Sequence, residues 1–105
     1  MYIQQKKVQN LNKELVEIPG TTLPFYKYEE NGLTIFEFDA TKCSPPEPMV
    51  NTIRGLSLLK SENDRLVGLF FHEPFPLYER IPFTIAHEAT ELESGDFRVE
   101  FKLQD

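Results

Sequence analysis

The sequence predicts an α/β (α+β) two-layer sandwich, because strand and helix patterns alternate along the chain. A strand-helix-strand pattern spans residues 33–71, and a strand pair spans residues 83–103. The chain of 105 residues fits one domain, and its 40% hydrophobic content suffices for one core. We therefore expect the order β-α-β-α-β-β, a four-stranded mixed sheet with helices on one face, and one strand added from the N-terminal residues.

Residues 1–32 are expected to form an N-terminal extension of the main domain, residues 33–105. Runs rich in aromatic residues at 23–28 and 33–38 flank Glu-Glu-Asn-Gly, which is typical of a β-hairpin because Asn and Gly tolerate positive φ. The extension is therefore expected to hold a short helix, an added strand, or both. The helix is indicated by apolar residues at helical spacing before Pro19-Gly20, namely Val8, Leu11, Leu15 and Ile18.

The middle of the chain predicts a helix that begins within residues 45–48. Ser44 and Glu47 form a capping-box pattern, whereas Pro48 favours a start at that residue. Gly55 costs roughly 1 kcal/mol relative to alanine in a helix, and it permits close packing on a sheet. The expected apolar face of this helix comprises Met49, Ile53, Leu56 and Leu59.

The remaining elements follow from short apolar runs and prolines. We expect a strand over residues 65–71, a short helical turn over 77–81, and a final strand pair over 83–92 and 97–103. The strands at 33–38 and 65–71 are apolar on both faces, although helices cover only one face of the sheet. We expect the N-terminal residues, in preference to a second copy of the chain, to cover the other face.

The charge and the lack of targeting signals exclude several classes of protein. The net charge is −6 and no basic stripe is visible, which excludes nucleic acid and an anionic membrane as the main partner. The longest apolar run has six residues and is too short to span a bilayer. The N-terminus lacks the apolar core of a secretory signal, and a single cysteine fits a reducing compartment. We expect a cytoplasmic protein.

Cys43 is the only cysteine and lies between a predicted strand and the predicted helix. His72 ends the next parallel strand, so both residues are expected at the same edge of the sheet. A helix N-terminus and a neighbouring histidine both lower the pKa of a thiol, which would make Cys43 reactive. The simpler interpretation, which we favour, is that Cys43 is a buried loop residue and His72 a turn residue.

Two proline motifs, Pro-Pro-Glu-Pro-Met at residues 45–49 and Glu-Pro-Phe-Pro-Leu-Tyr at 73–78, resemble those of the TusA/SirA-like family of small sulfur-relay proteins. The resemblance covers about residues 33–103. Family members carry persulfide sulfur on the cysteine of a Cys-Pro-x-Pro motif, and here Pro45 stands at that position. The motifs are most similar to a branch of unknown function that lacks the family cysteine, so the resemblance implies a fold more than an activity.

We therefore expect a non-enzymatic binding or protein-interaction module. Its protein partner or small ligand is expected at the sheet edge formed by residues 43–48 and 72–78. The alternative is a sulfur carrier or sulfurtransferase accessory, with Cys43 as persulfide acceptor and His72 favouring the thiolate. The expected binding residues are Pro46, Glu47, Pro48, Glu73 and Tyr78.

We expect no cofactor and no metal site. His72 and His87 are each followed by glutamate, but neither spacing is a recognised ligand motif. Period-two counting instead predicts that His87 is a partly buried strand residue. The sequence is also compatible with a homodimer.

Overall fold

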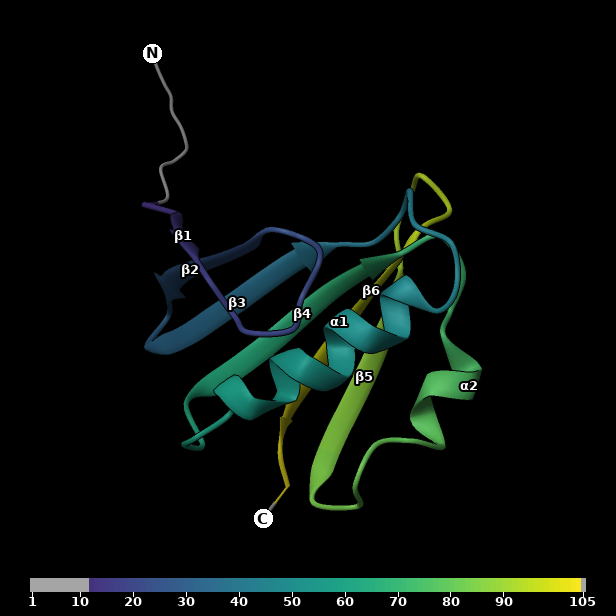
Figure 1. Ribbon diagram of the computed structural model, residues 1–105. Coiled ribbons are helices and arrows are strands. Elements are labelled where there is room, and N and C mark those ends of the chain that lie inside the picture. The colour runs from purple at the N-terminus through teal and green to yellow at the C-terminus, as the bar shows by residue number, and fades with distance from the viewer. Residues whose placement is uncertain (1–11, 105) are drawn as a thin grey trace.

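The computed structural model describes residues 12–104, which form an α+β fold with a six-stranded mixed sheet and short helices (Figure 1). The strands lie in the order β1-β2-β3-β4-β6-β5, and only β3 and β4 are parallel. The predicted class is confirmed, but the sheet has one strand more than expected. The elements are β1 (Glu14–Val16), β2 (Phe25–Glu30), β3 (Leu33–Asp39), α1 (Glu47–Gly55), the 3₁₀ turn η2 (Leu56–Leu58), β4 (Asp64–Phe70), α2 (Phe75–Tyr78), β5 (Ile85–Glu91) and β6 (Phe97–Leu103).

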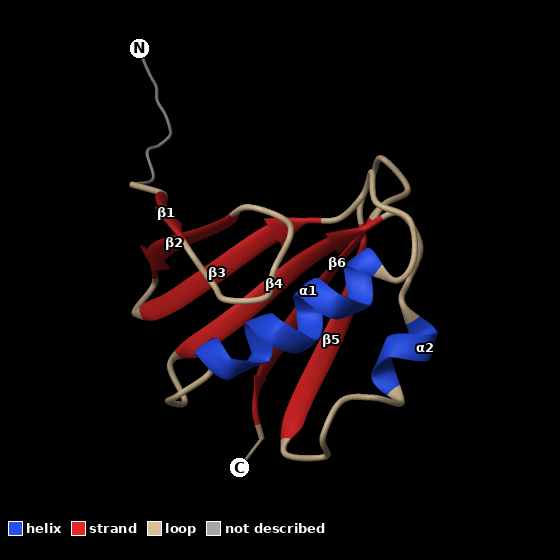
Figure 2. Ribbon diagram, viewed as in Figure 1, coloured by secondary structure: helices blue, strands red, loops and turns tan. Residues whose placement is uncertain are grey.

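The predicted strand-helix-strand unit is confirmed by β3, α1 and β4. Figure 2 shows α1 lying over one face of the sheet, with α2 beside β5. The helix starts at Glu47, within the predicted range, whereas α2 starts at Phe75, two residues earlier than expected. Within residues 12–104, no helix has the length and hydropathy needed to cross a membrane.

The predicted hairpin joins β2 to β3. Asn31 and Gly32 form its tip with φ of 53° and 80°, which suits these two residue types. The two strands then pair antiparallel from Glu30 opposite Leu33 to Tyr26 opposite Glu37. The hairpin therefore attaches the N-terminal extension to the sheet as an added strand.

The predicted N-terminal helix is wrong where it can be compared with the structure. Residues 14–16 form β1, which pairs antiparallel with β2. A short isolated helix is marginally stable, whereas the strand gains hydrogen bonds from β2 and lets Val16 pack against the core. Val8 and Leu11, the other part of the helical pattern, lie outside the described residues.

The main core lies between α1 and the sheet. Its aromatic centre is Phe25 stacked on Phe38, with ring centroids 4.9 Å apart, and Phe70 edge-on to Phe38 at 5.8 Å. Phe25 belongs to the extension, so residues before position 33 help to build the core of the main domain. The other members of this buried cluster are Ala40, Leu59, Leu66, Leu77, Val99 and Phe101.

The predicted apolar face of the helix is confirmed for Leu59, which is buried in the core, and for Met49 and Leu56, which pack against it, but not for Ile53. Asn51 and Thr52 are fully buried, whereas Ile53 is 38% exposed. The hydroxyl of Thr52 donates to the carbonyl of Pro48, one turn back in the helix. Gly55 confirms the expected close packing, because a Cβ atom there would lie 2.9 Å from the ring of Phe25.

The second sheet face is covered by charged side chains, and the large apolar patch expected there is absent from the described residues. Its apolar cluster is small, comprising Tyr28, Ile35 and Val67. Lys13 lies 5.0 Å from the ring centroid of Tyr28, and the Tyr28 hydroxyl donates to Glu37. The extension thus helps to cover this face, as preferred, but as part of the sheet. Further cover comes from ion pairs of Glu100 with Arg65 and Arg98.

Candidate functional site

The two predicted site segments follow the carboxyl ends of the neighbouring parallel strands β3 and β4. Cys43 lies in the turn after β3 and is half-buried, and His72 is exposed after β4. The His72 ring packs edge-on against Phe71, with ring centroids 4.4 Å apart. His72 is not among the groups that shift the pKa of Cys43. The segments share an edge, but among the described residues Cys43 is not paired with His72, as the sulfur-carrier alternative would require.

The surroundings of Cys43 raise the pKa of its thiol. Burial is the largest cause, followed by a hydrogen bond to Glu47 and by the negative charges of Glu47 and Asp39. Burial and the neighbouring carboxylates both disfavour the charged thiolate. The shift is opposite in direction to the lowered pKa that the alternative, a reactive Cys43, would require.

Glu47 takes part in a hydrogen-bond cluster that joins α1 to the extension. Its carboxylate accepts a short hydrogen bond from the hydroxyl of Thr22. Asn51, one turn further along α1, accepts from the backbone N–H groups of Thr22 and Leu23 at 2.9 and 3.1 Å. The Asn51 amide also donates to Thr22 Oγ1 and to the Glu47 carbonyl. Glu47 is thus engaged within the chain.

The two predicted proline contacts lie at the start of α1. Pro46 is the residue that precedes the helix and is exposed, and the peptide bond between Pro45 and Pro46 is cis. Pro48 is half-buried, in the first turn. Proline suits this position because the first helical N–H groups have no partner inside the helix.

The second predicted segment forms an aromatic cluster with β5. The Tyr78 hydroxyl donates to Glu73 at 3.2 Å, and the Tyr78 ring stacks on His87 with centroids 3.8 Å apart. Burial and the Glu73 carboxylate raise the pKa of Tyr78. His87 was expected to be partly buried, but its side chain is exposed and is held by this stack.

Three phenylalanines close to this cluster are strongly exposed. Phe71 is 61% exposed, Phe75 63% and Phe83 87%. All three lie between the end of β4 and the start of β5. These side chains are therefore not part of the buried core.

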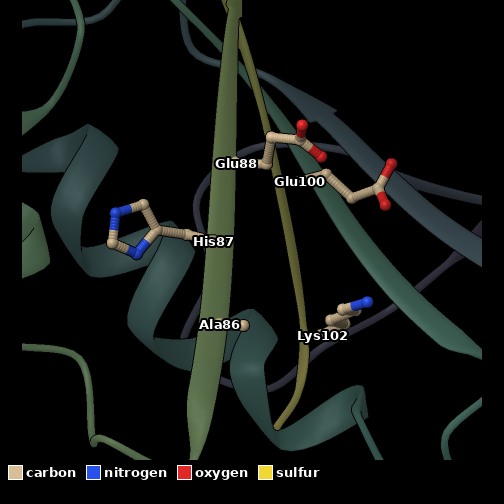
Figure 3. A pocket seen from close by; sticks show the side chains of 5 residues that line it. All are labelled: Ala86, His87, Glu88, Glu100 and Lys102. Carbon is tan, nitrogen blue, oxygen red and sulfur yellow. The ribbon is translucent and has the colours of Figure 1, made fainter.

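Two open hollows border β5. One, of about 340 Å³, is lined by Ala86, His87, Glu88, Glu100 and Lys102 (Figure 3). It lies where the small side chain of Ala86 leaves space beside the long side chains of β6. The other, of about 370 Å³, is bordered by Tyr78, Phe83 and His87. Within residues 12–104, no group of three or more histidine, cysteine or acidic side chains is placed to hold a metal ion.

Thr22 and Asn51 were not predicted from the sequence. Asparagine is unfavourable inside a helix unless its side chain finds a partner, so an asparagine between Val50 and Thr52 was a usable signal. Its partners lie 28 and 29 residues earlier in the chain, and no local pattern identifies them.

Replacing Glu47 with glutamine is expected to lower the pKa of the Cys43 thiol. The variant removes a carboxylate beside the sulfur but keeps an oxygen that can accept from Thr22. The rate of alkylation by iodoacetamide should rise at neutral pH, and the pH profile should move to lower pH. Asp39→Asn, which removes the more weakly acting carboxylate, should move the profile less. An unchanged profile in Glu47→Gln would contradict the assigned cause.

No family model, curated protein or solved structure matches the chain. The resemblance to the TusA/SirA-like family stays a prediction, supported by the two proline motifs alone. The geometry of the described residues identifies a solvent-exposed aromatic segment after β4 and a turn after β3 whose polar groups bond within the chain.

Proposed function

We propose that the protein is a non-enzymatic interaction module that binds a protein partner at the His72–Tyr78 segment. The observation that carries the proposal is the exposure of Phe71 and Phe75, each more than 60%. They are four residues apart, so their Cα atoms are within about 14 Å of each other. One partner surface can therefore cover both rings.

The chemistry of the partner follows from the groups around these rings. The chain carries a net charge of −6; Glu73 lies within the segment and Glu79 directly follows it. An apolar patch surrounded by acidic groups suits a partner with apolar side chains at its centre and basic residues around them. The alternative, a sulfur carrier using Cys43, gains no support from a thiol whose pKa is raised.

The double variant Phe71→Ser/Phe75→Ser is expected to lose the partner while keeping the fold, because neither side chain is buried. Immobilised wild type, this variant and Phe83→Ser would be incubated with extract of the producing cells, and bound proteins quantified by mass spectrometry. A protein retained by wild type and Phe83→Ser but lost from the double variant would be purified. Its affinity for the double variant should then be lower by about tenfold or more.

Two outcomes would contradict the proposal. Equal retention by all three proteins would show that the phenylalanines are not contacts. A mass increase of one sulfur atom after incubation with a persulfide donor, absent in Cys43→Ser, would instead support the carrier function. The two measurements are independent.

A further inference from the structure

The outer edge of β5 is a second surface, separate from the His72–Tyr78 segment. β5 pairs with β6 alone, over seven consecutive residue pairs without a bulge, and contains no proline. Proteins usually protect sheet edges by short strands, prolines or bulges. The opposite edge has such protection, because β1 is only three residues long. β5 is long and has no proline or bulge, although it carries charged side chains and α2 lies beside it (Figure 2), which are two further ways of protecting an edge.

The hydrogen bonds at both ends of the β5–β6 pair define which backbone groups point outward. Gln104 donates to the carbonyl of Thr84, and Leu92 donates to the carbonyl of Asp96. Antiparallel neighbours exchange these bonds at every second residue. Even-numbered residues of β5 therefore bond to β6. The N–H and C=O groups of His87, Ala89 and Glu91 point away from the sheet.

We propose that this edge pairs with the same edge of a second copy of the chain. The two β5 strands would run antiparallel across a two-fold axis, with Ala89 opposite Ala89. In this register His87 lies opposite the second copy's Glu91, and Glu88 lies opposite its Thr90. The symmetry repeats each pair, so the contact gains four polar cross-strand pairs.

Charge selects this register over its neighbours. An axis at Glu88 would pair the whole strand but would place two glutamates directly opposite each other, which is unfavourable. An axis at His87 would place Glu88 opposite Ala86 and Glu91 opposite Phe83, so that neither carboxylate gains a polar partner. Only the axis at Ala89 gives both carboxylates a partner without opposing like charges.

Two further observations support the pairing. Within residues 12–104 the carboxylates of Glu88 and Glu91 form no ion pair, and both side chains are exposed. Elsewhere in the chain, Glu29 lies directly opposite Thr34, and the threonine hydroxyl donates to its carboxylate at 3.0 Å. Glu88 and Thr90 of two copies would repeat that pair. Figure 3 shows His87 on one side of β5 and Glu88 on the other, so both faces of the strand contribute.

Sedimentation velocity of the full chain should show a mass that rises from 12.2 kDa toward twice that value as the concentration increases from micromolar to millimolar.

Glu91→Lys should weaken the dimer by about tenfold, because it places lysine opposite His87 twice. Glu62→Lys changes the net charge equally in an exposed turn remote from β5. Reduced repulsion should leave its dimer unchanged or tighter. The double variant His87→Glu/Glu91→Lys reverses the pair and should restore association.

Amide hydrogen exchange gives a second readout within the same strand. The amides of His87 and Ala89 should exchange fast in dilute solution and become protected as the concentration rises. Those of Glu88 and Thr90 already bond to β6 and should be protected throughout. A chain that stays at 12.2 kDa at every concentration would overturn the proposal. The strand that pairs with this edge would then have to come from another protein. Equal effects of Glu91→Lys and Glu62→Lys would also overturn the proposal.

Discussion

Replacing Asn51 with alanine is expected to lower the free energy of unfolding by about 3 kcal/mol. The side chain is fully buried and makes three hydrogen bonds to the loop that precedes β2, and a fourth to the Glu47 carbonyl within α1. Alanine leaves the N–H groups of Thr22 and Leu23 without acceptors. Its better helix propensity recovers about half a kcal/mol at most. Urea denaturation of wild type and variant measures the difference.

Thr52→Ala is the matched control for Asn51→Ala. Thr52 is equally buried on the same helix, but its hydroxyl bonds only to Pro48 one turn away. Its loss should cost about 1 kcal/mol. In Asn51→Ala, and not in Thr52→Ala, the amides of Thr22 and Leu23 should also exchange faster with solvent. Equal destabilisation by both variants would mean that the bonds to the extension contribute little.

The strand and helix order could be predicted because it depends on local patterns. Asn31-Gly32 between two aromatic-rich runs specifies a hairpin, since both residues accept the positive φ that the turn requires. The alternation of β6 likewise predicted that Val99 and Phe101 would be buried. These signals lie within a few residues of the structure that they specify.

Hydrophobic spacing predicted Met49, Leu56 and Leu59 on the core side, but the burial of Asn51 could not be predicted, because its partners are distant in sequence. Hydrophobic periodicity favoured Ile53, but the extension lies against Asn51 and supplies it with hydrogen bonds. A polar side chain in a helix can be buried when such partners exist. The same tertiary contact replaced the expected N-terminal helix with β1, whose pairing with β2 lies outside any local pattern.

In the candidate site, too, the parts that depend on local topology were predictable, whereas those that depend on distances between side chains were not. The topology of parallel strands correctly predicted that the turns after β3 and β4 lie at one edge of the sheet. The sign of the Cys43 pKa shift depends first on the burial of the thiol and then on the carboxylates beside it. Burial and the carboxylate of Glu47 raise this pKa, and sequence spacing alone gives neither the burial of the thiol nor its distance from Glu47. The exposure of Phe71 and Phe75 also emerges only from the packing of α2.

Replacing Gly68 with alanine is expected to destabilise the fold by about 2–3 kcal/mol. Gly68 lies in the middle of β4, on the sheet face that packs against the aromatic core. A Cβ atom there would lie 2.7 Å from the ring of Phe70 and 2.8 Å from that of Phe38. Both rings are almost completely buried, so neither can move without opening the core. The melting temperature and the urea midpoint should both fall.

Gly55→Ala is the control for Gly68→Ala, because the new methyl group again meets the core, 2.9 Å from Phe25. In the helix, alanine recovers about 1 kcal/mol of propensity, so the net loss should be smaller. A second test combines Gly68→Ala with Phe70→Leu, which removes the ring atoms nearest the new methyl group. If overlap with this ring is the cause, the double variant should lose clearly less stability than the sum of the single variants. Simple additivity would instead place the strain at Phe38 or in the backbone of β4.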